Sequence, residues 1–242
     1  MANQIRVTLE IGPKGKKVVA VAPDWPGLER GASTGEAAIE RLLSYVPRYA
    51  TVTKLAGMES AFPNTTVVDV VEQYPGTGST DFWGISYAFS SIDQQAMSGE
   101  ALERELTLMR ACWAFFDDVH SRVSVEMQRG PRGGGRDRDR IVRHTFAAEL
   151  DWAKKLDIRT PLEEMLTGEG LNAHRDAYCH AIWDYHSQGK LAGTMAKWPL
   201  RYLILHTAYH TLDHAWEMED KDLTAKRVCG RALYQHRIIP NN

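Results

Sequence analysis

Two histidines near the C-terminal end of the chain have the spacing of a metal-ligand pair. His210 and His214 are four residues apart, so on a helix their side chains lie one turn apart on the same face. Both imidazoles can then reach a single divalent ion. A third ligand must come from another segment, and His144 is the best candidate because it lies at the edge of an otherwise apolar helical pattern. Three histidine ligands leave coordination positions open, as in catalytic sites that activate a bound water or thiol.

Two further histidines stand close to this predicted site. His206 lies one turn before His210, so a His206/His210 pair with His214 at the rim is an alternative. His120 takes an inward position in an earlier helical pattern, where it is an additional ligand, an outer hydrogen-bond donor or a hydrogen-bonded core histidine. We favour the core position for His120. The competing interpretation of the whole set is a group of unrelated core or surface histidines.

Three carboxylates are placed to support a histidine site. Asp213 and Glu217 share a predicted helix with the histidine pair, and Glu149 shares one with His144. Carboxylates often accept a hydrogen bond from the second ring nitrogen of a ligand imidazole and so orient it. One of the three can instead act as a general base, and Asp213 and Glu217 are the candidates for this catalytic role. Ordinary helix-surface acids are the competing interpretation, which is stronger for Glu149 than for Asp213.

The histidine pair lies in a stretch, Trp198–Lys221, that is apolar on two sides when placed on a helix. A helix of this kind belongs inside a core. Its remaining strip is nevertheless polar and consists of His206, His210, Asp213, His214 and Glu217. Burying imidazoles and carboxylates without partners is costly, and a metal ion is one partner that satisfies several of them together.

Three more helices are expected before this one. Apolar residues at 4-3-4-3 spacing predict a long helix over 102–127, and weaker patterns predict helices over 139–156 and 169–188. Four helices with short to moderate connections predict an antiparallel bundle. The segment GPRGGGRDRDR, 130–140, lacks the Lys-Ser/Thr ending of a phosphate-binding loop, so we expect a solvated loop rather than a nucleic-acid-binding arm.

The N-terminal part predicts a small α+β unit. Residues 4–11 and part of 16–23 alternate between apolar and polar side chains around a Gly-Pro turn, which predicts a hairpin. Ser33 and Glu36 have the spacing of a capping box, so a helix is expected from there, ended or kinked at Pro47. The β-branched residues of 65–74 predict another strand.

These patterns predict an α+β fold with a small domain at 1–75, a connector at 76–99 and a four-helix bundle at 100–242. The end of the chain after Leu223 is expected to form a last strand or a short helix.

Composition excludes several classes of partner. The 242 residues are 43% hydrophobic and 25% charged with a net charge of -2, which gives no general attraction for nucleic acid or anionic membranes. No apolar segment is long enough to span a membrane, and no signal peptide is evident, so a cytoplasmic location is expected. Three widely spaced cysteines indicate neither a disulfide framework nor a thiolate zinc site. Serine-hydrolase, dinucleotide and HExxH motifs are absent from the sequence.

Two motifs resemble those of a known family. The segments HTFAAELDW, 144–152, and HTLDHAWEMED, 210–220, together with GSTDFWG, 78–84, resemble the DinB-like (DinB/YfiT) superfamily of metalloenzymes over roughly residues 80 to 222. The resemblance implies a four-helix bundle with a divalent metal, often zinc or nickel, held by His144, His210 and His214. It therefore favours the later histidine pair over His206/His210. It also implies a homodimer and metal-dependent transfer of a low-molecular-weight thiol, or related isomerase or hydrolase chemistry.

The segment PDWPGLERGASTGEA, 23–37, resembles HicB-like α+β domains, although this likeness covers only about fifty residues. Two functions follow as hypotheses. The first is a metal-dependent thiol transferase or hydrolase that acts on a small-molecule substrate. The second is a non-enzymatic binding or regulatory module, stabilised by the metal, that acts through its N-terminal domain.

Overall fold

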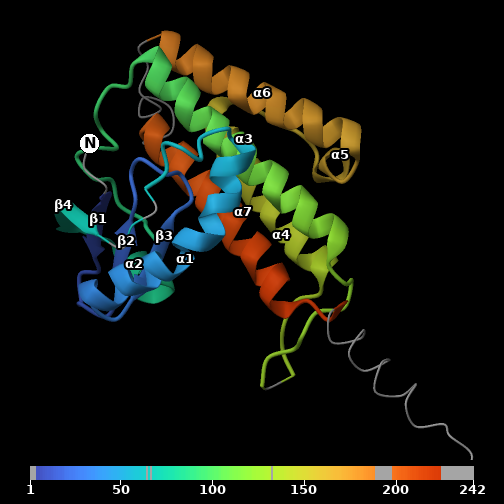
Figure 1. Cartoon of the computed structure of the whole chain (residues 1–242). Coiled ribbons are helices and arrows are strands. Elements are labelled where there is room, and N and C mark those ends of the chain that lie inside the picture. The colour runs from blue at the N-terminus through green and yellow to red at the C-terminus, as the bar shows by residue number, and fades with distance from the viewer. Residues whose placement is uncertain (1–3, 64, 66, 132, 189–197, 225–242) are drawn as a thin grey trace, which may run out of the picture.

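A computed structural model describes residues 4–63, 65, 67–131, 133–188 and 198–224. Within these residues the protein has a mixed α+β fold, made of a four-stranded sheet and seven α-helices (Figure 1). The predicted α+β class is therefore confirmed. No helix of the described part is long and apolar enough to cross a membrane. The predicted structure of the C-terminal tail falls on residues 225–242, which lie outside the described residues.

The sheet has the strand order β3-β2-β1-β4. Strands β1 (Ile5–Ile11) and β2 (Val18–Val21) form the predicted antiparallel hairpin, and β3 (Glu29–Ala32) extends it. Strand β4 (Val68–Pro75) begins later than the sequence pattern indicates and pairs with β1 in parallel. A parallel pair needs a crossover, which the helix between β3 and β4 provides.

That crossover helix, α1 (Gly35–Leu55), differs from its prediction at two points. Its N-cap is Thr34, whose hydroxyl accepts a hydrogen bond from the Ala37 backbone N–H at 3.2 Å, so the capping box predicted at Ser33 is wrong by one residue. Pro47 lies inside the helix, so of the two predicted effects, ending or kinking the helix, the first is wrong. The helix continues because its buried face extends on both sides of the proline, through Ala38, Leu42, Val46, Tyr49 and Val52.

The predicted connector contains a helix of its own, α2 (Gly78–Trp83), with a capping box between Thr77 and Thr80. The Asp81 carboxylate accepts hydrogen bonds from three backbone N–H groups of the β1–β2 turn, at Lys14, Lys16 and Lys17, over 2.7–3.2 Å. The connector is therefore bound to the sheet rather than extended between two parts.

Helices α3 (Gly99–Arg122), α4 (Arg138–Ala153), α6 (Gly168–Ser187) and α7 (Leu200–Lys221) correspond to the four predicted helices. A 3-10 turn, Lys154–Leu156, and a short helix, α5 (Leu162–Met165), were not predicted. Helix α3 ends at Arg122 rather than at residue 127, because the following residues pair with the end of α7. The contacts are a β-bridge between Met127 and Asp222 and hydrogen bonds from the Ser124 N–H and hydroxyl to the Asp222 carboxylate.

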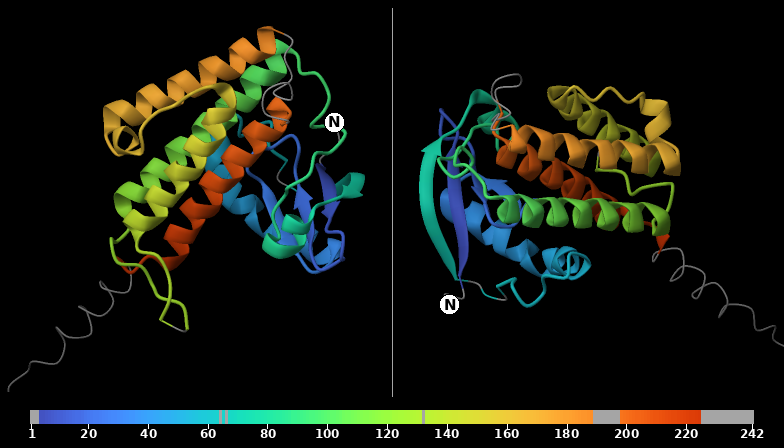
Figure 2. Two further views of the ribbon diagram at one scale, coloured as in Figure 1. Left: turned by 180° about the vertical axis from the view of Figure 1, so that it is seen from behind. Right: turned by 90° about the horizontal axis from the view of Figure 1, so that it is seen from above.

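Helix α7 lies at the centre of the molecule. Fifteen of its 22 residues are buried, which confirms the prediction of a helix apolar on two sides. Its C-terminal half packs with the sheet, α1 and α3 in one cluster of apolar side chains, and its N-terminal half packs in a second cluster with α3 and α6. Figure 2 shows the sheet and α1 on one flank of α3 and α7, with α4 and α6 on the other. Helix α7, which carries His206, His210 and His214, is thus held from both sides.

The central position of α7 makes its apolar side chains critical for stability. Leu212 is fully buried in the larger cluster, whereas Leu55 at the end of α1 is 52% exposed. We expect Leu212→Ala to lower the free energy of unfolding by about 3 kcal/mol, because it removes buried methyl groups and leaves a cavity. The matched change Leu55→Ala should alter it by no more than about 0.5 kcal/mol. Urea denaturation measures both, and equal effects would contradict the central role of α7.

Candidate metal centre

The structure brings His144 of α4 together with His210 and His214 of α7. Each offers one ring nitrogen, and these three atoms all lie within 4.8 Å of one another. The ring centroids of His210 and His214 are 4.5 Å apart, and that of His144 lies 5.2 Å from His210 and 4.9 Å from His214. The three residues predicted as ligands therefore form one group that can hold a metal ion.

The group has the chemistry that a divalent cation requires. Burial, together with the neighbouring His214 and His144, lowers the pKa of His210 to about 2, so its imidazole is neutral at physiological pH. Burial also lowers the pKa of His144, with the charge of Arg136 as the next cause. The Nδ1 atom of His210 is buried and has no hydrogen-bond partner. Neutral imidazoles with available lone pairs are metal ligands, and an ion would give a partner to this buried nitrogen.

Glu217 supports one of the three ligands. Its Oε2 lies 2.7 Å from Nδ1 of His214, and its other oxygen pairs with Lys221 one turn further along α7. The hydrogen bond from His214, with that from Lys221, lowers the pKa of Glu217 to about 2, so this carboxylate is ionised. A carboxylate at Nδ1 fixes the ring orientation and leaves Nε2 to face a metal. Glu217 therefore has the geometry of the orienting acid expected from the sequence.

Asp213 is placed differently. Its Oδ1 lies 3.6 Å from the guanidinium of Arg30, a buried residue of β3. That guanidinium also stacks on the rings of Tyr45 and Trp216, with 3.5 and 4.6 Å to the centroids. The Asp213 carboxylate is thus paired with the sheet, and among the described residues it makes no hydrogen bond or ion pair to the histidine group. The two acids of the polar strip serve different partners.

Neither of the two additional histidines belongs to the group. His206 is buried and stacked on Tyr202, with a ring separation of 5.3 Å, and burial lowers its pKa to about 4. Trp152 lies between it and the site, with its ring 4.9 Å from His206 and 5.1 Å from His210. His120 on α3 is half-buried and lines a separate cavity of about 220 Å³ with Arg143 and Leu166.

A buried polar pair that the sequence did not indicate joins α4 to α6. Glu149 of α4 is only 1% exposed, accepts a hydrogen bond from the Trp113 indole at 2.8 Å, and has its other oxygen 3.6 Å from Nε2 of His174 on α6. The interpretation of Glu149 as a surface acid was wrong. Its position between Phe146 and Ala153 in the apolar spacing of α4 is the signal that would have revealed its burial.

Comparisons with known proteins identify no relative: no family model matches the chain, and neither curated proteins nor solved structures gave a match. What the structure defines is an α+β protein with a three-histidine group, on two helices, that can hold a metal ion.

The contact between Glu217 and His214 predicts an effect on metal affinity. We expect Glu217→Gln to weaken zinc binding at least about tenfold, because the neutral amide no longer stabilises the orientation and basicity of the ligand imidazole. Asp213→Asn, on the same helix but paired with Arg30, is the matched control and should leave the affinity unchanged. Competition with a chromophoric chelator measures both, and an unchanged affinity of Glu217→Gln would contradict the orienting role.

The Glu149–His174 pair predicts an unusual pH dependence. Burial raises the pKa of Glu149 from 4.5 to about 7 and lowers that of His174 from 6.5 to about 4. Between about pH 4.5 and 6.5 the folded pair holds one proton on Glu149, and the unfolded chain holds one proton on His174. Since both states bind the same number of protons, the pair adds no slope to stability in this range.

Single substitutions should reveal the two opposing contributions. In Glu149→Gln only the lowered pKa of His174 remains, so stability should rise with pH between about 4 and 6.5 relative to the wild type. In His174→Gln only the raised pKa of Glu149 remains, so relative stability should fall as the pH rises from about 4.5 to 7. Urea denaturation across this range measures the slopes, and parallel curves for the three proteins would refute the assignment.

Proposed function

We propose that the protein is a metal-dependent enzyme whose divalent ion is bound by His144, His210 and His214. The observation that carries this proposal is the convergence of three imidazoles, one of which has a buried nitrogen without a hydrogen-bond partner among the described residues. The group contains three residues of the described part of the chain and no carboxylate or thiolate. Three protein ligands leave room for a substrate, which is the arrangement of catalytic rather than structural sites.

The reaction class follows from the chemistry of such a site. A divalent ion in this position supplies Lewis acidity, which makes a thiol or a water molecule a stronger nucleophile near neutral pH. Glu217 holds His214 in one tautomer and orientation, and Lys221 in turn holds Glu217. Trp152 covers one side of His210 and limits the access of bulk water there. We propose transfer of the activated nucleophile to a small electrophilic substrate, or hydrolysis of that substrate.

The resemblance to DinB-like proteins supports the same proposal. It assigns one metal ligand to the second bundle helix and two to the last, and His144 lies on α4 while His210 and His214 lie on α7. We propose that α3, α4, α6 and α7 are the DinB-like four-helix bundle, that the sheet with α1 is a HicB-like extension, and that zinc or nickel is the native metal. A low-molecular-weight thiol cosubstrate, a homodimer and a cytoplasmic location complete the proposal.

A second candidate is a non-enzymatic module in which the metal only joins α4 to α7. The observation that favours it is an exposed aromatic pair on α2, where Phe82 is 73% and Trp83 is 64% exposed. Exposed aromatic side chains are typical of protein interaction surfaces. X-ray absorption of the zinc-loaded protein distinguishes the candidates. An exchangeable oxygen beside the imidazoles supports the enzyme, and a closed shell of four protein ligands supports the module.

Metal analysis tests the proposed site directly. Protein purified without a polyhistidine tag should contain about one zinc or nickel ion per chain, and His210→Ala and His214→Ala should each lose most of it. The matched control is His180→Ala, because His180 is an exposed histidine on α6. Retention of the metal by both α7 variants would overturn the proposal. Incubating the metal-loaded protein with an electrophile, with and without candidate thiols, then separates transfer from hydrolysis.

A further inference from the structure

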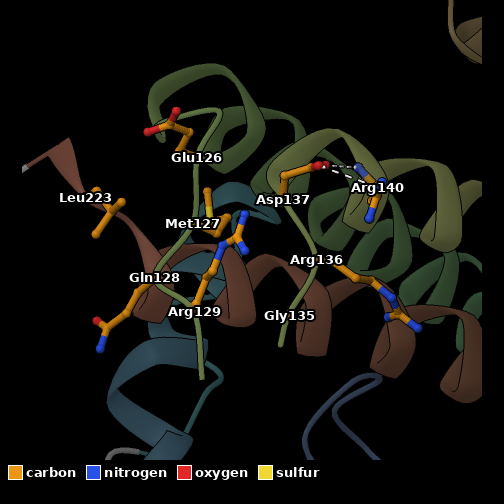
Figure 3. A pocket seen from close by; sticks show the side chains of 9 residues that line it. All are labelled: Glu126, Met127, Gln128, Arg129, Gly135, Arg136, Asp137, Arg140 and Leu223. Carbon is orange, nitrogen blue, oxygen red and sulfur yellow. Dashed lines mark hydrogen bonds and ion pairs between the residues drawn. The ribbon is translucent and has the colours of Figure 1, made fainter. Parts of the chain in front are cut away.

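A pocket of about 710 Å³ lies where the α3–α4 loop meets the end of α7 (Figure 3). This volume is typical of sites for small organic ligands. The two limbs of the loop form most of its wall, one before and one after the glycine-rich turn. The lining residues are Glu126, Met127, Gln128, Arg129, Gly135, Arg136, Asp137, Arg140 and Leu223.

Backbone hydrogen bonds hold the two limbs in place. The Gln128 N–H donates to the Lys221 carbonyl at 2.8 Å, and the Leu223 N–H donates to the Ser124 hydroxyl at 3.0 Å, which attaches the first limb to the end of α7. The Arg138 N–H donates to the Val125 carbonyl at 3.0 Å, which attaches the second limb to the first. The pocket is therefore built into the fold, although the loop around it is rich in glycine.

The charges in the pocket favour an anion. Three arginines and two acids line it, and Figure 3 shows Arg140 paired with Asp137, at 3.5 Å between Nε and Oδ2. Among the described residues, Arg129 and Arg136 have no ion-pair partner. A guanidinium binds carboxylate or phosphate with several parallel hydrogen bonds, so two unpaired ones in a concave site are suited to such a group.

The pocket lies two helical turns from the histidine group. Asp137, the N-cap of α4, precedes His144 by seven residues, and Lys221 follows His214 by seven residues on α7. Both spacings correspond to about 10 Å along the helix axis. Hydrogen bonds link the side chains of His214, Glu217 and Lys221 in series over the same interval. Arg136 belongs to the lining of the pocket and precedes His144 by eight residues.

We infer that this pocket binds a carboxylate or phosphate group of the small molecule on which the metal centre acts, with Arg129 and Arg136 as the recognising residues. The link to the metal rests on the proposed function, whereas anion binding by the pocket does not. The substrate class is then an elongated acid, whose anionic group and reacting atom are about 10 Å apart. The concave walls favour a small ligand over the nucleic acid that a basic loop also attracts.

Calorimetric titration of the full-length, metal-free protein with inorganic phosphate and with succinate, at constant ionic strength, tests the anion site. We expect saturable binding, weakened about tenfold in Arg129→Gln and in Arg136→Gln, since each removes charged hydrogen bonds. Arg143→Gln is the matched control, because it is an exposed arginine of α4 outside this pocket and should not change the affinity. The probe that binds with the higher affinity identifies the preferred anionic group.

Several outcomes would overturn the inference. The first is that neither probe shows saturable binding. The second is that Arg143→Gln loses as much anion affinity as Arg129→Gln and Arg136→Gln. The third is that RNA binds in a manner that depends on Arg129 and Arg136, while phosphate and succinate do not bind. His210→Ala must keep the anion affinity, since failure of the metal site leaves the pocket intact. A loss of anion binding in His210→Ala alone would mean that the anion is held at the histidines instead.

The link between the two sites has its own measurement. In the cobalt-loaded protein, the relaxation of the phosphate ³¹P signal reports its distance from the metal. We expect about 10 Å for phosphate held by the arginines. A distance typical of direct coordination, unaffected by Arg129→Gln and Arg136→Gln, would place the anion on the metal and refute the two-site arrangement.

Discussion

The structure depends on one helix that is buried on two sides and still carries ionisable groups. Helix α7 packs beside α3, with the sheet and α1 in one apolar cluster and with α6 in another, so His206 and much of His210 are shielded from bulk water. Imidazoles in such a setting remain neutral, which is why the pKa of His206 and of His210 lies far below the usual value. Neutral, converging imidazoles are what a divalent ion binds most readily. The same burial that builds the core therefore favours metal binding by the histidine group.

The polar strip of α7 is divided between two tasks. Glu217 accepts from His214 and so belongs to the proposed metal centre, whereas Asp213 pairs with Arg30 and so belongs to the contact with the sheet. Arg48 of α1 adds to that contact through ion pairs with Glu219 and Asp220. The N-terminal sheet and α1 are therefore joined to the histidine-bearing helix by charged contacts as well as by the shared apolar core. This arrangement couples the orientation of α7 to the sheet and α1.

Buried carboxylates also attach the predicted connector to the sheet. Glu10 of β1 is fully buried and accepts hydrogen bonds from the Ser86 hydroxyl and from the Tyr87 and Ala88 N–H groups, at 2.6 to 3.2 Å. With the contacts of Asp81 to the β1–β2 turn, these bonds satisfy backbone donors that an irregular segment would otherwise leave unpaired. The connector can therefore follow an irregular path and still be ordered. Tyr202 of α7 donates to the Ser86 carbonyl, which brings the same segment against the central helix.

The sequence by itself determined the features that depend on local periodicity. The 3.6-residue repeat revealed the four long helices, the alternation over 4–11 and 16–23 revealed the hairpin, and the four-residue spacing of His210 and His214 placed two imidazoles on one face. These are properties of a single segment. Only the tertiary structure decided what lies opposite each face. The burial of Glu149 against Trp113, the pairing of Asp213 with Arg30 and the end of α3 at Arg122 all depend on a neighbour distant in sequence. A one-dimensional pattern states which side chains share a face, but the free energy of a charge depends on the environment that the folded chain places around it.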